Sequence, residues 1–288
     1  MLAPRYMTDF ICTAASCTHS CCIGWEIDVD GATVDYYRSL PEKERSKILK
    51  TIRFDAEGAH FGLGADGRCL NLDKHGLCRI IRMLGKQALC DICREHPRFY
   101  HDTDREEAGL GAACEAAAAL ILTSDAYADF IPIDGDDSPV PLATDFNPRE
   151  ERERLYALLS DRARPLTARL ALLDAGYGRC VADRTVLHAL EYLDEAHRRL
   201  LTNAGQALFS AEYAELCERF FAYLIYRHAS PTASRADFAR AVRLSRFVLE
   251  LFDALVEVNG MSPVTAAVTL SEEIEYSEDN TARLLAAV

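Results

Sequence analysis

The sequence predicts a mainly α-helical protein, with a cysteine-rich N-terminal domain that contains little strand and an α-helical, bundle-like C-terminal domain. Nine of the eleven cysteines precede residue 115. A stretch rich in proline and aspartate then follows at 131–148, and it disfavours both helix and strand. Beyond it, apolar residues recur at helical spacing. We therefore expect a cysteine-rich domain over 1–130, a linker over 131–148 and a helical domain over 149–288.

Short elements are expected in the cysteine-rich part. Residues 26–31 alternate between polar and apolar before a glycine, which predicts one short strand. The glycines between 54 and 73 predict an irregular loop that could carry ligands. Caps, apolar spacing and alanine content predict helices over 33–40, 41–52, 77–90 and 114–128.

The C-terminal part is predicted to be nearly all helix, with apolar faces typical of a bundle core. Capping residues, glycines and prolines indicate where these helices begin and end. The expected helices span 149–161, 166–174, 183–201, 211–228 and 234–258, and a further helix begins at 262–263.

The composition excludes several classes of function. A net charge of −13, from 45 acidic and 32 basic side chains, argues against nucleic acid as a partner because it repels phosphate backbones. The longest apolar run, 116–122, is too short to cross a bilayer, and residues 1–9 lack the pattern of a secretory leader. We therefore expect a cytoplasmic protein without a membrane partner. Its thiols should stay reduced and serve metal ligation or redox chemistry.

The cysteines are the main candidates for chemistry. They open with the pattern Cys-x4-Cys-x3-Cys-Cys from Cys12 to Cys22, and the later ones lie in short, turn-rich segments. Thiolates are ligands for zinc and for iron–sulfur clusters. The adjacent thiolates of Cys21 and Cys22 do not easily bind one tetrahedral zinc together, which favours a cluster. Zinc is the alternative, and scattered buried thiols or disulfides remain open as well.

An ordered set of blocks resembles the flagellin lysine-N-methylase family, which is related to a zinc- or iron-chelating family with a CxxCxxCC-type signature. The first block is the Cys12–Cys22 pattern, which continues into Gly24-Trp25. The later blocks are Gly67-Arg68-Cys69, Leu77-Cys78, Cys93-Arg94 with Pro97-Arg98, and Cys114-Glu115-Ala116. The resemblance covers about the first 125 residues.

The resemblance implies a [4Fe-4S] cluster and methyl transfer from S-adenosylmethionine to lysines of a protein substrate, with flagellin as the expected substrate. By matching position, the candidate metal ligands are Cys12, Cys17, Cys21, Cys22, Cys69, Cys78, Cys93 and Cys114. Cys90 is extra to the family pattern, although Cys90-x-x-Cys93 alone is typical of a metal or redox pair. Eight thiols exceed the needs of one cubane cluster, so a second metal or purely structural cysteines stay open.

Three side chains are candidates for binding the cofactor. Trp25, the only tryptophan, could form an aromatic wall that favours the cationic cofactor, or it could anchor the cysteine loop as a buried side chain. Arg94 and Arg98 could hold a carboxylate such as that of the cofactor's methionine part, or they could form salt bridges with neighbours such as Glu95. The sequence assigns neither a catalytic base nor an oligomeric state.

The favoured function is protein-lysine N-methyltransferase, and it rests on the family resemblance. Two functions of other classes stay open. One is a non-catalytic zinc- or iron-chelating module whose helical half binds a partner. The other is an iron–sulfur redox protein in which Cys90 and Cys93 form the exchangeable pair.

Overall fold

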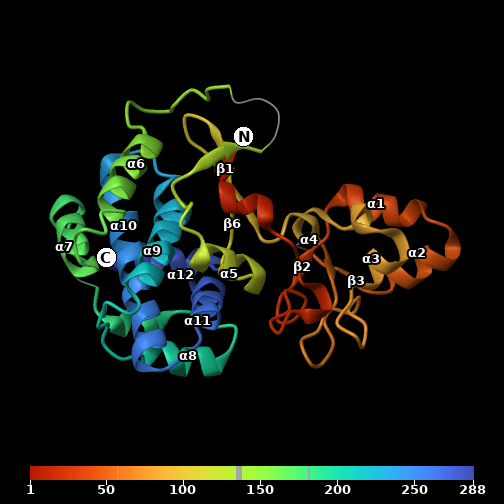
Figure 1. Cartoon of the computed structure of the whole chain (residues 1–288). Coiled ribbons are helices and arrows are strands. Elements are labelled where there is room, and N and C mark those ends of the chain that lie inside the picture. The colour runs from red at the N-terminus through yellow and green to blue at the C-terminus, as the bar shows by residue number, and fades with distance from the viewer. Residues whose placement is uncertain (57, 134–137, 181) are drawn as a thin grey trace. The chain divides into compact units, whose positions relative to one another are not determined.

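The computed structural model describes residues 1–56, 58–133, 138–180 and 182–288. The chain forms two compact units (Figure 1). The helical unit comprises Met1–Phe10 and Arg98–Val288, and the cysteine unit comprises Ile11–Pro97. The cysteine unit is therefore inserted between two segments of the helical unit.

The cysteine unit combines a small antiparallel sheet with short helices. Strand β4 lies between β2 and β3, and Phe61 pairs with Ile27 on one side and with Ile52 on the other. The elements of this unit are η2 (Ala14–Ser16), β2 (Ile27–Asp28), α1 (Gly31–Ser39), α2 (Glu42–Leu49), β3 (Ile52–Phe54), β4 (Ala59–Phe61), α3 (Arg79–Leu84), η3 (Lys86–Ala88) and α4 (Asp91–Glu95).

Two local predictions for this unit are wrong in detail. The loop expected over 54–73 contains β4, because this strand pairs with the neighbouring β3 and with the distant β2, and local composition does not reveal the second pairing. The helix expected over 77–90 is divided into α3 and η3. Gly85 lies at the division with a φ of 88°, a left-handed conformation that glycine adopts easily and that ends α3.

The helical unit contains a four-stranded sheet in the order β5-β6-β1-β7. Strand β1 runs parallel to β6 and antiparallel to β7, and β5 and β6 form an antiparallel pair. The elements of this unit are β1 (Leu2–Pro4), η1 (Arg5–Asp9), β5 (Arg98–Asp102), β6 (Glu106–Leu110), α5 (Glu115–Thr123), β7 (Phe130–Pro132), α6 (Pro148–Leu159), α7 (Leu166–Tyr177), η4 (Arg184–Ala189), α8 (Glu195–Thr202), α9 (Ala214–Ala229), α10 (Arg235–Asp253), η5 (Ala254–Val258), α11 (Pro263–Leu270), η6 (Ser271–Glu275) and α12 (Glu278–Ala287).

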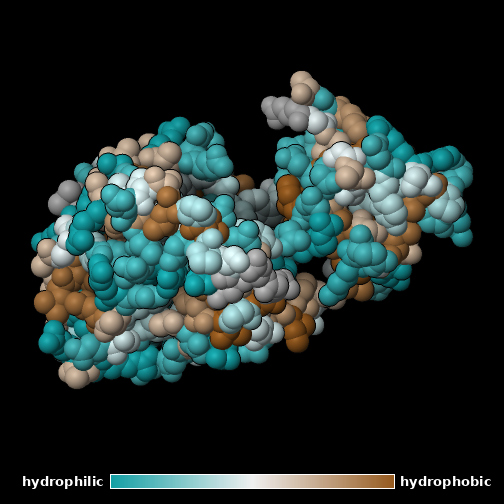
Figure 2. All heavy atoms as spheres, turned by 90° about the horizontal axis from the view of Figure 1, so that it is seen from above, coloured by the Kyte–Doolittle hydropathy of each residue, from teal (hydrophilic) through white to brown (hydrophobic). Residues whose placement is uncertain are grey.

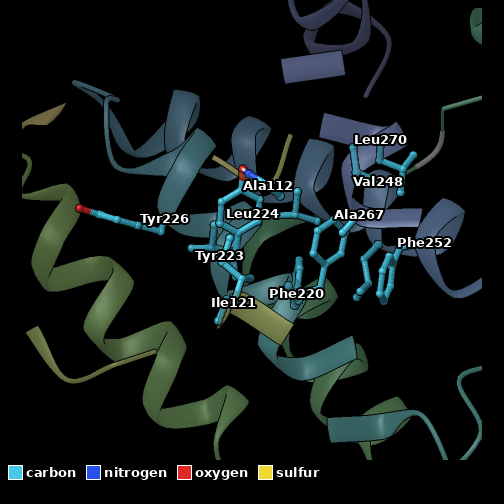
Figure 3. Packing of buried hydrophobic residues seen from close by; sticks show 14 of the residues in the cluster. Ala112, Ile121, Phe220, Tyr223, Leu224, Tyr226, Val248, Phe252, Ala267 and Leu270 are labelled. Carbon is cyan, nitrogen blue, oxygen red and sulfur yellow. Dashed lines mark hydrogen bonds between the residues drawn. The ribbon is translucent and has the colours of Figure 1, made fainter. Parts of the chain in front are cut away.

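Helix α9 forms the centre of the core of the helical unit. Its residues 220–226 are all buried, α10 packs along it, and α5 and α6 also contact it. Figure 3 shows Phe220, Tyr223 and Leu224 of α9 among buried side chains of α5, α10 and α11. The hydroxyl of Tyr223 accepts the backbone N–H of Ala112 at 2.9 Å. The core therefore also holds the turn that precedes α5.

The chain divides elsewhere than at the expected boundary after residue 130. Strands β5 and β6 join β1 in one sheet, and α5 packs against α9 and α11, so residues 98–123 belong to the helical unit. Within the expected linker, residues 131–132 belong to β7 and Pro148 begins α6. Residues 134–137 of that linker lie outside the described residues.

The mainly α-helical class is confirmed, with two small sheets in addition. The helix expected over 183–201 is two elements, η4 and α8. Asp183 accepts the N–H of Thr185 at the start of η4, and Asp194 accepts the N–H of Ala196 at the start of α8. Two capping aspartates thus begin two helices within one apolar pattern. The longest expected helix is present as α10 followed by the π-helical turn η5.

Hydrophobic side chains at the surface are dispersed. On the face drawn in Figure 2, hydrophobic residues in brown alternate with larger areas of hydrophilic residues in teal. The most exposed large hydrophobic side chains are Ile11, Leu208 and Phe54. Over the ranges that the structure describes, no helix has both the length and the apolar character needed to cross a bilayer.

A buried ion pair fixes α6 to the sheet of the helical unit. Arg152 and Glu107 are fully buried, with 2.6 Å between Nη2 and Oε1, and the guanidinium lies over the rings of Phe130 and Tyr226. We expect Arg152→Met to lower the free energy of unfolding by about 3–5 kcal/mol, because it leaves the Glu107 carboxylate buried without its partner. Urea denaturation followed by far-ultraviolet circular dichroism measures this loss.

The matched control is Arg240→Met, which removes an exposed ion pair with Asp237 in α10. Exposed pairs contribute little, so this variant should change the free energy of unfolding by less than about 1 kcal/mol. Equal losses in the two variants would contradict the assignment of Arg152 as a buried anchor.

Candidate metal centre

Five thiols gather in the small core of the cysteine unit. They are those of Cys22, Cys69, Cys78, Cys90 and Cys93, which share one hydrophobic cluster. Cys69 and Cys90 are buried, and the other three are partly buried. They come from segments far apart along the chain, so the fold brings them together.

The segments of Cys22 and Cys69 are joined directly. The backbone N–H of Cys69 donates to the carbonyl of Cys22 at 2.8 Å, and isolated β-bridges pair Ile23 with Arg68 and Leu63 with Cys69. The ladder thus holds the two thiol-bearing residues side by side.

Cys78 immediately precedes α3. Its segment is held by a bridge to Leu72 and by a hydrogen bond of 2.8 Å from the N–H of Arg79 to the carbonyl of Asn71. The backbone N–H groups of Ile80 and Ile81 act to lower the pKa of Cys78, against the larger effect of burial, which raises it. Nearby N–H groups stabilise sulfur that carries negative charge.

Cys90 is the N-cap residue of α4, and Cys93 lies in the first turn of this helix. The turn is fixed from α1 by two side chains. The Tyr37 hydroxyl donates to the carbonyl of Ala88 at 2.7 Å. The carboxylate of Asp30, which caps α1, accepts the N–H of Asp91 at 3.1 Å. The positions of both thiols are therefore defined by α1 as well as by α4.

The thiols also affect one another electrostatically. Burial raises the pKa of Cys69, and the charges of Cys22 and Cys78 raise it further. Burial likewise raises the pKa of Cys78, and the charges of Cys22 and Cys90 raise it further. A thiolate in this cluster is therefore costly without a nearby cation.

Hydrogen bonds between neighbouring thiols favour the thiolate at two positions. The hydrogen bond with Cys21 lowers the pKa of Cys22 to about 7, although burial opposes this. The hydrogen bond between Cys90 and Cys93 lowers the pKa of Cys90 and raises that of Cys93. The thiolate is the form of cysteine that binds metals.

The remaining predicted ligands lie in different surroundings. Cys12 and Cys21 are exposed, and Cys17 is partly exposed and donates its thiol to the carbonyl of His19 at 2.5 Å. Cys114 belongs to the helical unit, where it precedes α5. The cysteine unit therefore contains seven of the eight predicted ligands, together with Cys90.

The thiols do not form a ready-made coordination sphere. Among the residues that the structure describes, no group of three or more His, Cys, Asp or Glu side chains is arranged to hold a metal ion. The donor chemistry nevertheless fits zinc or an iron–sulfur cluster, because both take four thiolates.

The three predicted cofactor residues are divided between the units. Trp25 and Arg94 belong to the cysteine unit, and Arg98 belongs to β5 of the helical unit. Arg94 pairs with Asp91 and with Glu95 and donates to the carbonyl of Leu89 at 3.2 Å. The guanidinium of Arg98 lies 5.7 Å from the centre of the Phe10 ring.

The family pattern does not include Cys90, but in the structure Cys90 lies in the same hydrophobic cluster as the other four thiols. Cys90 is completely buried. The Cys-x-x-Cys spacing is the signal in the sequence that indicates this residue, because it places both sulfurs on one turn of a helix.

Three curated proteins match part of the chain. The flagellar biosynthetic protein FliU of Salmonella muenchen is 34% identical over 126 residues, which are 41% of this chain and 75% of that protein. Lysine-N-methylases of Salmonella choleraesuis and Salmonella typhimurium are each 34% identical over 126 residues, again 41% of this chain, but only 31% of those proteins. No family model matches the chain, and no solved structure matches it significantly.

Removing the hydroxyl of Tyr37 tests whether its hydrogen bond to Ala88 stabilises the segment that carries Cys90. Tyr37→Phe leaves the buried carbonyl of Ala88 without its donor, so we expect the free energy of unfolding of the cysteine unit to fall by about 1–3 kcal/mol. Trp25 is the only tryptophan and lies in this unit, so its fluorescence during urea denaturation reports the change.

The neighbouring Tyr36 provides the matched control, because its side chain is exposed. Tyr36→Phe should leave the denaturation midpoint nearly unchanged. A midpoint for Tyr37→Phe that equals that of Tyr36→Phe would show that the hydrogen bond to Ala88 does not support the α4 turn.

Proposed function

The chain belongs to the family of the Salmonella flagellar biosynthetic protein FliU, and from this premise we propose that it methylates lysine side chains of a flagellar protein. Flagellin is the substrate we expect, and S-adenosylmethionine the methyl donor. The observation that carries the proposal is the 34% identity shared with two proteins named lysine-N-methylase. The match covers about a third of each of those two proteins, so activity and substrate are transferred here as a proposal.

The proposed reaction is a direct methyl transfer. The lysine ammonium first loses a proton, because its ordinary pKa near 10.4 keeps it protonated and unreactive at neutral pH. The amine nitrogen then forms a bond to the methyl carbon as the bond between that carbon and the sulfonium sulfur breaks. The products are a methylated lysine, S-adenosylhomocysteine and one released proton. The contribution of the protein is to align the amine with the methyl group and to accept the proton.

Trp25, Arg94 and Arg98 remain the candidates for contacting the cofactor. An aromatic face such as that of Trp25 stabilises a sulfonium cation through the charge distribution of its ring. A guanidinium such as that of Arg94 or Arg98 binds a carboxylate with two hydrogen bonds. In the structure Arg94 is already paired with Asp91 and Glu95, and the guanidinium of Arg98 lies 5.7 Å from the centre of the Phe10 ring.

We also propose that the thiol cluster binds a [4Fe-4S] cluster, with zinc as the alternative. The support is the gathering of five thiols in a small hydrophobic core. A bound metal centre supplies positive charge that balances the thiolates and links the short elements that carry them. Hydrogen bonds from the N–H of Asp91 to Asp30 and from Tyr37 to the carbonyl of Ala88 fix the backbone on both sides of Cys90.

A second candidate function is thiol redox chemistry at Cys90 and Cys93. Their positions favour it, because Cys90 is the N-cap residue of α4 and Cys93 lies in the first turn of the same helix. In that reaction the two thiols would give two electrons and two protons to a disulfide of a partner and would themselves form one disulfide. Metal ligation and disulfide formation exclude each other at these sulfurs.

Methylation can be tested with the full chain purified without air. We expect unmodified flagellin incubated with the protein and S-adenosylmethionine to gain methyl groups on lysine, as mapped by peptide mass spectrometry. The control replaces S-adenosylmethionine with S-adenosylhomocysteine, which has no methyl group to transfer. Flagellin that stays unmethylated with both cofactors would refute the substrate assignment, and binding of neither cofactor in calorimetry would refute the enzyme.

A further inference from the structure

A cleft of about 500 Å³ lies within the helical unit, between α6 on one side and β1 and the start of β7 on the other. One wall consists of Leu2 and residues 128–130. The side chains of the other wall are three or four positions apart along α6 and its C-cap, so they share one face of the helix. They are Arg149, Arg152, Glu153, Tyr156, Ala157 and Ser160. A cleft of this volume has room for a small organic molecule.

Arg149 is held in the cleft wall by two carboxylates. Its Nε and Nη2 donate to the carboxylate of Asp104 at 2.7 and 2.6 Å, and its Nη1 donates to Glu153 at 2.6 Å. A guanidinium has five N–H groups, so some N–H groups of Arg149 remain for a ligand. The side chain is partly exposed and therefore within reach from the cleft. A guanidinium fixed in this way is suited to a ligand carboxylate.

Two further side chains of the cleft are carboxylates that are about half exposed. Glu153 uses one oxygen for Arg149, and Asp129 uses one for Arg5 at 2.5 Å. Across the described ranges, the second oxygen of each carboxylate has no hydrogen-bond donor. Carboxylate oxygens accept from ammonium and hydroxyl groups, so these two can bind such groups of a ligand.

Aromatic side chains complete the lining. Tyr156 is buried, and its hydroxyl is fixed by donating to the carbonyl of Ala222 at 2.8 Å. The ring of Phe130 is held by the guanidinium of Arg152, 4.6 Å from its centre. Both aromatic rings are thus fixed in place before any ligand arrives. Aromatic rings bind planar bases and attract cations through their faces.

The charges around the cleft favour a ligand with net positive charge. The charge of Arg152 is balanced by the buried Glu107. Among the remaining ion pairs of the cleft, carboxylates outnumber guanidinium groups by one. These side chains are Arg5, Arg149, Asp104, Asp129 and Glu153. A ligand rich in phosphate would be repelled by the excess negative charge.

We propose that this cleft binds the methyl donor, S-adenosylmethionine. The inference rests on the proposed methyltransferase function and specifies where its donor binds. The donor has a carboxylate suited to Arg149, and ammonium and ribose hydroxyl groups suited to Glu153 and Asp129. Its adenine ring suits the aromatic lining, and its sulfonium group gives it a net positive charge. This site replaces Trp25, Arg94 and Arg98, which the structure divides between the two units.

Calorimetry with the full chain, purified without air, tests this site by filling it. Ala157→Phe adds a ring to the cleft at an exposed position and removes no side-chain hydrogen bond. We expect the dissociation constants for S-adenosylmethionine and S-adenosylhomocysteine to rise at least several-fold. The matched control is Ala171→Phe, another exposed alanine, which lies on α7. Equal affinities in the two variants would overturn the assignment.

A second pair of variants tests the charge of the cleft. S-adenosylmethionine carries a sulfonium charge that S-adenosylhomocysteine lacks, so we expect Glu153→Gln to weaken binding of the former more than that of the latter. Glu150→Gln removes another exposed carboxylate of α6, one that does not line the cleft, and should change neither affinity. An unchanged ratio of the two affinities in Glu153→Gln would contradict the match of charge.

A third measurement uses the unaltered protein and so does not depend on the folding of a variant. Hydrogen–deuterium exchange followed by peptide mass spectrometry compares the protein with and without S-adenosylhomocysteine. We expect the ligand to slow exchange in peptides that contain residues 128–130 and 148–160. Slower exchange confined to residues 11–97 would place the ligand in the cysteine unit and would refute this site.

The outcomes distinguish this inference from the proposed function. If the unaltered protein binds neither S-adenosylmethionine nor S-adenosylhomocysteine, both the function and the site are wrong. If it binds them and Ala157→Phe binds them as tightly, the site alone is wrong. Methylation of flagellin is measured separately and does not decide between the two locations.

Discussion

Five thiols pack into the hydrophobic core of the cysteine unit, beside aliphatic and aromatic side chains, and the short elements of the unit surround this core. Its hydrophobic cluster is small, and Cys69 and Cys90 are among its buried members. A core of this size supplies limited stability by itself, and small domains commonly rely on a metal or on cross-links. Metal ligation by buried sulfur would add a further link between the segments that carry the cysteines, beside their short strands, single hydrogen bonds and shared hydrophobic cluster.

The elements of the cysteine unit can be understood as supports for those sulfurs. The carboxylate of Asp30 accepts N–H groups from Thr33 and Asp91, so one side chain connects the beginning of α1 with the turn that carries Cys90. The Tyr37 hydroxyl holds the carbonyl two residues before Cys90. Short β-bridges position Cys69 and Cys78 in the same way. The helical unit depends on different interactions, namely the aromatic core around α9 and the buried pair of Arg152 and Glu107.

The sequence predicts those features that depend on neighbouring residues. Ser234 and Ser262 begin helices as expected, since a capping side chain acts within three residues of its own position. The concentration of cysteines likewise indicates the candidate site. The insertion of the cysteine unit could not be predicted, because it depends on the pairing of Leu2 with Glu107 and with Pro132, which are remote in the chain. Strand β4 depends in part on its pairing with the remote strand β2, which the local pattern does not show.

The central claim is that buried sulfur atoms of the cysteine unit bind a metal centre. X-ray absorption spectroscopy at the iron and zinc edges of the full chain, purified without air, tests it most directly. The account predicts a nearest shell made only of sulfur, at about 2.3 Å from the metal, with four protein thiolates. A nearest shell of nitrogen and oxygen, or a preparation in which neither metal is bound, would contradict it.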